Sequence, residues 1–302
     1  MSTSLSSSKT RSGLLCVSNT TRRATIRQMF VVLTAACMGF PALPVMAELS
    51  LFPTRIVLER NQRAAQVELV NRGGEPETYR IALVNRRMTE TGEIVPADTA
   101  EAGERFADEM LRFSPRQVTI PPGGSQTVRI LLRKPADLAS GEYRSHLQFD
   151  RMEDTAASSS IEASGKPAGN EIGVVIRALV GASIPIIVRH GDTNASVALS
   201  NLALIPASGQ DGPLIAMHMN RNGNRSVYGD LSVTITPVGG KPVEVARAGG
   251  VAVYAPNAVR RATMPLQIPP SLNLTGATLQ LSYRERPEAG AKLMAEASLK
   301  LP

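Results

Sequence analysis

One arginine stands out as a residue that could take part in binding chemistry. Arg55 lies within residues 51–59 (LFPTRIVLE), an otherwise apolar stretch that reads as the first strand. A guanidinium among apolar neighbours stays charged and presents a rigid fork of donors that fits a carboxylate. The other reading is a strand residue whose outer face lies in solvent. The spacing alone leaves both readings open.

Residues typical of catalysis are sparse. The three histidines, His146, His190 and His218, are far apart and fit no metal-ligand spacing. Residues 190–192 (HGD) read as a polar linker rather than as a catalytic pair. The chain has neither a G-x-S-x-G motif nor a phosphate-binding loop. We therefore expect no enzyme, no metal site and no cofactor.

The N-terminus resembles a secretory signal peptide over residues 1–47. Arg22, Arg23 and Arg27 form a basic region, residues 29–39 (MFVVLTAACMG) form an apolar core, and residues 45–47 (VMA) fit the cleavage pattern. We expect export through the inner membrane into the periplasm. No second apolar stretch is long enough to span a membrane, so we expect no stable membrane insertion after cleavage.

Cleavage would change the charge of the protein. The whole chain has a formal net charge of +7, but residues 1–47 hold five of its 33 basic residues and none of its 26 acidic ones, which leaves +2. A charge this small gives no support to nucleic-acid binding. Both cysteines, Cys16 and Cys37, would leave with the signal, so the secreted form would have no disulfide of its own.

The rest of the chain reads as short strands separated by turns. Residues 66–70 (QVELV) alternate between polar and apolar side chains, and residues 79–84 and 127–132 are similar. Turn signals such as Asn71-Arg72-Gly73-Gly74 separate these strands at short spacing. This cadence predicts an all-β fold of two tandem immunoglobulin-like β-sandwich domains, at residues 48–188 and 193–302.

The longest apolar stretch covers residues 173–188 (GVVIRALVGASIPIIV) and contains one charge, Arg177. It is shorter than the roughly 20 residues of a membrane span and longer than a typical strand of about 5–6 residues. A polar segment rich in serine and alanine, residues 153–170, precedes it. Such an apolar strand needs a cover, either from its own fold or from a partner.

Four ordered motifs resemble the first domain of periplasmic pilus chaperones of the chaperone–usher pathway. They are residues 53–57 (PTRIV), 67–71 (VELVN), 113–116 (FSPR) and 122–129 (PGGSQTVR). The long apolar strand lies where that family has its subunit-binding strand. The resemblance spans residues 48–189 and weakens over the second domain, where residues 222–230 form the best patch.

The resemblance implies that the strand is lent to a partner. A pilus subunit lacks the last strand of its own sandwich, and the chaperone fills the groove with alternate side chains. With the period of two in a strand, Val174, Ile176, Ala178 and Val180 share one face. We expect these four to be the donors, because the other face carries the charge of Arg177. In the alternative, this segment fills the core of its own sandwich. In both cases we expect residues 184–188 to stay paired within the fold.

The resemblance also implies an anchor for the C-terminal carboxylate of the subunit. Arg55 matches the first of two basic residues that the family uses. The second, a lysine, falls on Pro185, which cannot bind a carboxylate. Either Arg55 acts alone, or Arg144 or Arg177 replaces the lysine, or the subunit is held differently.

One further pair of residues is expected to link the two domains. Arg189 matches an arginine that bridges the domains in the family, and Glu142 is its expected partner. The resemblance thus implies a non-enzymatic chaperone that stabilises pilus or fimbrial subunits and delivers them to an outer-membrane usher. The alternative is a structural immunoglobulin-like surface component, or a pilus-associated one, without chaperone activity.

Overall fold

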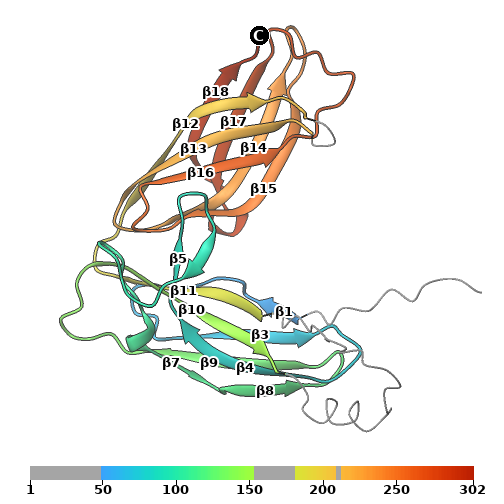
Figure 1. Ribbon diagram of the computed structural model, residues 1–302. Helices are drawn as coiled ribbons and strands as arrows, with labels where there is room; N and C mark the ends of the chain where they lie inside the picture. The colour runs from blue at the N-terminus through green and yellow to red at the C-terminus, as the bar shows by residue number, and fades with distance from the viewer. Residues whose placement is uncertain (1–48, 153–180, 209–211) are drawn as a thin grey trace, which may run out of the picture. The chain divides into compact units, whose positions relative to one another are not determined.

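The computed structural model describes residues 49–152, 181–208 and 212–302. Apart from two short 3-10 turns, the regular elements in these ranges are strands, and they form two β-sandwiches (Figure 1). Within the described ranges no helix is long and apolar enough to cross a membrane. Residues 47–302 form one compact unit, so the predicted division into domains at 48–188 and 193–302 stays a prediction.

The first sandwich packs two sheets around one core. One sheet has the strand order β1-β3-β9-β7, and the other has the order β2-β11-β10-β4-β8. A separate hairpin pairs β5 with β6. The bounds are β1 Leu49–Phe52, β2 Ile56–Leu58, β3 Ala64–Asn71, β4 Glu77–Val84, β5 Arg86–Met88, β6 Ile94–Pro96, β7 Leu111–Ser114, β8 Gln117–Ile120, β9 Ser125–Leu132, β10 Gly141–Arg151 and β11 Gly181–His190.

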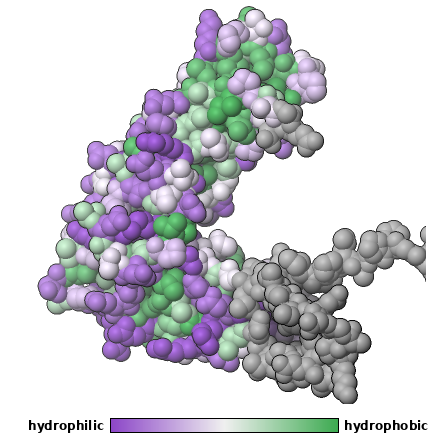
Figure 2. Space-filling view, viewed as in Figure 1, coloured by the Kyte–Doolittle hydropathy of each residue, from purple (hydrophilic) through white to green (hydrophobic). Residues whose placement is uncertain are grey.

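The second sandwich has sheets of order β12-β13-β16 and β15-β14-β17-β18 around a core of its own. Its strands are β12 Ala195–Ile205, β13 Leu214–Gly223, β14 Val227–Thr236, β15 Val243–Val253, β16 Val259–Pro265, β17 Thr278–Glu285 and β18 Leu293–Lys300. On the face shown in Figure 2, apolar side chains gather over this second sandwich, whereas hydrophilic ones predominate over the first.

The topology confirms the predicted fold class. An immunoglobulin sandwich places strands A, B, E and D in one sheet and C, F and G in the other. In the first sandwich β1-β3-β9-β7 follows the order A-B-E-D, and β4, β10 and β11 lie side by side as C, F and G. In the second, β12-β13-β16 corresponds to A-B-E and β14-β17-β18 to C-F-G. The alternation predicted for residues 66–70 is also confirmed, since Val67 and Leu69 are fully buried and Gln66 and Glu68 are exposed.

The prediction that residues 51–59 form one strand is wrong. The chain leaves the first sheet after Phe52, where β1 ends, and enters the other sheet at Ile56, where β2 begins. β1 pairs with β3, whereas β2 runs parallel to β11. Pro53 lacks an amide hydrogen and cannot continue the ladder of β1, which suits a change of sheet at this point. Arg55 lies in this crossing segment, directly before β2.

β11 contains the described part of the long apolar stretch. It pairs antiparallel with β10 along its whole length, but only residues 186–188 also pair with β2. Ile184, Ile186 and Val188 are buried in the core of the first sandwich. The prediction that residues 184–188 stay paired within the fold is therefore confirmed. Among the described strands, none pairs with residues 181–185 on the side away from β10, and Pro185 suits such an edge because it needs no partner for an amide hydrogen.

Several predicted features lie outside the described residues. They are the signal peptide at residues 1–47, the loop at residues 153–170, and the donor segment with Val174, Ile176, Ala178 and Val180, together with Arg177.

Candidate functional site

Arg55 lies between two tyrosines of the second sandwich. Its Nη1 atom donates a hydrogen bond to the hydroxyl of Tyr254 over 3.1 Å. Its guanidinium carbon lies 4.4 Å from the centre of the Tyr228 ring and 5.4 Å from that of Tyr254. Tyr228 is on β14, and Tyr254 follows directly after β15. Two aromatic faces therefore hold the arginine that we expected to be a carboxylate anchor.

Arg144 approaches the same tyrosine from β10. Its guanidinium carbon is 4.1 Å from the centre of the Tyr254 ring, and the side chain is buried. Nη1 donates to the carbonyl of Ala255 over 3.3 Å, and Nη2 donates to the carbonyl of Arg86 over 3.4 Å. Burial lowers the pKa of Arg144, the charges of Glu142 and Glu104 oppose this shift, and the charge of Arg55 adds to it. Arg55 and Arg144 thus lie close enough to repel one another.

The imidazole of His146 is buried close to these arginines. Burial is the main reason that its pKa falls to about 3, and the charges of Arg144, Arg86 and Arg55 add to the shift. The imidazole is therefore neutral at the pH of ordinary growth. Its Nδ1 atom has no hydrogen-bond partner among the described residues. Within the same residues no group of three or more potential ligands could hold a metal ion.

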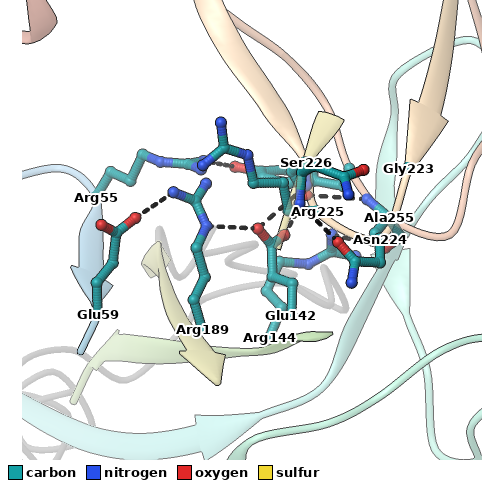
Figure 3. A network of polar contacts seen from close by, with 12 residues as sticks. Arg55, Glu59, Glu142, Arg144, Arg189, Gly223, Asn224, Arg225, Ser226 and Ala255 are labelled. Atoms are coloured by element: carbon teal, nitrogen blue, oxygen red, sulfur yellow. Dashed lines mark hydrogen bonds and ion pairs between the residues drawn. The ribbon is translucent and has the colours of Figure 1, made fainter. Parts of the chain in front are cut away.

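A second polar network lies beside these side chains (Figure 3). Arg189 Nε donates to Glu142 Oε2 over 3.0 Å, and Arg189 also pairs with Glu59. Glu142 is 2% exposed and accepts hydrogen bonds from the backbone amide of Ser226 (3.1 Å) and from its hydroxyl. The structure therefore brings Arg189 and Glu142 together, as expected. Ser226 belongs to the second sandwich, so the network joins the two sandwiches.

A hairpin that the sequence analysis did not single out also contacts the second sandwich. The carbonyl of Met88 on β5 accepts a hydrogen bond from Asn257, and the carbonyl of Glu90 accepts one from the amide of Arg261. Met88 packs in a small apolar cluster with Ala252 and Tyr254. The hairpin thus supports the loop that carries Tyr254.

The sequence did not predict that Tyr228 and Tyr254 contact Arg55. The chain has only five tyrosines, and this scarcity was the available signal. It could not indicate that two of them meet an arginine 173 and 199 positions away.

A cavity of about 680 Å³ opens beside Arg55. Arg55, Arg189, Arg225 and Lys292 supply its positive charge, and Glu59 and Glu285 its negative charge. Its remaining lining is largely apolar: Val57, Ala195, Val197, Val227, Tyr228, Ala289, Leu293 and Met294. Arg144 and Tyr254 do not line it. Its size and mixed lining suit the end of a peptide better than a small ion.

No protein-family model and no curated protein sequence matches the chain. Solved structures of pilus chaperones are similar to it. The CsuC–CsuE chaperone–tip adhesion subunit complex from Csu pili of Acinetobacter baumannii has a TM-score of 0.42 and 12% identity over 83% of this chain and 98% of that chain. The Escherichia coli chaperone DraB has a TM-score of 0.39 and 14% identity over 84% and 99%. The Pseudomonas aeruginosa chaperone CupB2 has a TM-score of 0.39 and 12% identity over 85% and 100%. Because these scores are below 0.5, the fold assignment rests on the chain's own strand topology.

Proposed function

We propose that this protein is a periplasmic chaperone that binds pilus or fimbrial subunits by lending them a β-strand. The sequence motifs at residues 53–57, 67–71, 113–116 and 122–129 support the proposal. The observation that carries it is the edge of β11 at residues 181–185, which no described strand covers and which directly follows the expected donor segment in the sequence. An unpaired strand edge can pair with a strand of another chain.

The donor residues would be Val174, Ile176, Ala178 and Val180. Their segment directly precedes β11, whose residues 184–188 pair with β10 and whose residues 186–188 also pair with β2. A donor segment attached to a paired strand keeps a defined register, because side chains alternate with a period of two. The subunit would gain the strand that its own sandwich lacks, with no cofactor and no catalytic step.

Arg55 would bind the C-terminal carboxylate of the subunit. It lines the cavity, and within the described residues no carboxylate lies in ion-pair distance of it. Arg189 and Glu142 would fix the two sandwiches around this site through Ser226. Arg144 or Arg177 would supply the positive charge that Pro185 cannot. After capture, the subunit would pass to an outer-membrane usher.

Co-expression with candidate fimbrial subunits tests the proposal. The wild-type protein should yield a one-to-one periplasmic complex. Ile176→Asp and Val180→Asp should abolish it, because each places a charge in the groove of the subunit. Val175→Asp and Leu179→Asp are matched controls on the opposite face and should retain capture.

The alternative of a structural component makes the opposite prediction. In that case the apolar segment covers its own fold, so Ile176→Asp and Val180→Asp would lower the unfolding midpoint of the free protein. A complex that forms equally well with all four variants would also contradict strand donation by Val174, Ile176, Ala178 and Val180.

A further inference from the structure

Two arginines share one tyrosine ring in this protein. The guanidinium carbons of Arg144 and Arg55 lie 4.1 Å and 5.4 Å from the centre of the Tyr254 ring. Arg55 also donates to the hydroxyl of Tyr254, and Arg144 holds the next peptide through the carbonyl of Ala255. Tyr254 is therefore fixed by Arg144 and in turn fixes Arg55.

The acids near this pair act on Arg144 only from a distance: the charges of Glu142 and Glu104 oppose the lowering of its pKa by burial. In the part of the chain that the structure describes, neither Arg55 nor Arg144 has a carboxylate within ion-pair distance. Arg144 is 6% exposed, its Nε atom has no hydrogen-bond partner there, and its other contacts are backbone carbonyls. Burying an unpaired charge costs free energy, so an anion that reaches this region would be stabilised.

Only one of the two arginines is reachable. Arg55 lines the cavity together with Tyr228, whereas Arg144 and Tyr254 lie outside its lining. An anion in the cavity can therefore contact Arg55, and Arg144 can act on it only through space. Such an interaction is stronger at a site with little water than in bulk solvent.

We propose that Arg144 and Tyr254 are positioning residues for Arg55: Tyr254 orients the guanidinium of Arg55, and the buried charge of Arg144 strengthens its binding of a peptide C-terminal carboxylate. This inference rests on the proposed role of Arg55 in subunit capture. It assigns the second positive charge of the site to Arg144 on β10, the strand that pairs with β11. There Arg144 faces Ile187, and the neighbouring His146 faces Pro185.

A peptide titration tests the inference directly. The probe is an acetylated tripeptide with a free C-terminal carboxylate, compared with its C-terminal amide, and the readout is the NMR signal of the Arg55 Nε–H group. The wild-type protein should bind the carboxylate about tenfold more tightly than the amide. Arg144→Met keeps the apolar stem but removes the charge and should remove most of that preference.

Two further variants separate positioning from packing. Arg260→Met is the matched control. Arg260 is a partly buried arginine that donates to a carbonyl and whose Nε has no hydrogen-bond partner in the described residues, but its guanidinium does not stack on the Tyr254 ring. It should retain the preference for the carboxylate. Tyr254→Phe keeps the ring but loses the hydroxyl that contacts Arg55, and it should weaken carboxylate binding about threefold.

The outcomes distinguish this inference from the proposed function. If the wild-type protein binds the acid and the amide equally, Arg55 is not a carboxylate anchor and that part of the proposed function is wrong. If Arg55→Met removes the preference while Arg144→Met keeps it within twofold, only the inference about Arg144 is wrong. If Arg144→Met does not fold, Tyr254→Phe decides, and carboxylate binding at the wild-type level would overturn the positioning role.

Discussion

Two polar groups, one around Arg189 and one around Arg55 and Arg144, lie where the sandwiches meet, and they differ in how their positive charge is paired. Arg189 is paired with Glu142 and Glu59, and Glu142 also accepts two hydrogen bonds from Ser226. Arg55 and Arg144 are held by tyrosine faces and carbonyls, and in the described residues no carboxylate lies within ion-pair distance of either. The first group is complete in the free protein and holds the structure together. The second makes no ion pair in the described residues, as the proposed carboxylate site requires.

The largest expected effect comes from breaking the group around Arg189. Glu142→Ala leaves the guanidinium of Arg189 and the amide of Ser226 without their buried partner. We expect a loss of about 3–5 kcal/mol in the free energy of unfolding, measured by urea denaturation. Glu59→Ala is the control, because Glu59 is 43% exposed, and it should cost at most about 1 kcal/mol. Equal effects of the two changes would show that burial of Glu142 does not matter.

Acid should lower the stability of the protein through His146, which lies close to Arg55 and Arg144. His146 is neutral in the folded protein because burial and nearby arginines lower its pKa to about 3, whereas the unfolded chain titrates near 6.5. Between these two values the unfolded state binds more protons, so stability falls as pH decreases from about 6.5 to 3. The loss should be on the order of 4 kcal/mol across this window.

The measurement for His146 is unfolding free energy against pH. His146→Gln keeps a polar side chain but cannot titrate, so its profile should be flatter than that of the wild-type protein over the same window. Parallel profiles for the two proteins would contradict the assignment.

A smaller effect is expected at the tip of the β5–β6 hairpin. Gly92 has φ +88°, and a Cβ atom there would overlap the guanidinium of Arg260. Gly92→Ala should therefore cost about 1–2 kcal/mol from backbone strain, with a further cost from the displaced guanidinium. Gly239→Ala is the control, because Gly239 has φ +70° and open space around it. Thermal unfolding of both variants separates backbone strain from the displacement of the Arg260 guanidinium. Equal decreases in the unfolding midpoint would show that the contact with Arg260 is unimportant.

The smallest effect on stability is expected for Arg55. Arg55→Ala removes one hydrogen bond and the contacts with two tyrosine rings, but it also removes one of two mutually repelling charges. Because these effects oppose one another, the free energy of unfolding should change by less than about 1 kcal/mol. Urea denaturation measures this change. A loss comparable to that of Glu142→Ala would show that Arg55 is structural, and the contrast between the two groups would disappear.

The sequence allowed the fold class to be predicted because strand alternation and turn residues are local signals. Val67 and Leu69 are buried as their spacing indicates. The division of the first strand was not predicted, since it depends on which sheet each half joins. The tyrosines at Arg55 were not predicted either, because no periodic pattern links residues 199 positions apart. Arg55 itself could be chosen because a charge in an apolar stretch is visible in the sequence.

The most direct test of the account is subunit capture by Arg55 variants of proven stability. Wild-type protein, Arg55→Ala and Arg55→Lys are each co-expressed with a fimbrial subunit, and the periplasmic one-to-one complex is quantified. We expect Arg55→Ala to lose the complex while its unfolding curve is nearly unchanged. Arg55→Lys should retain part of the complex, because a lysine keeps the charge but not the fork of donors. Undiminished capture by Arg55→Ala would contradict the account.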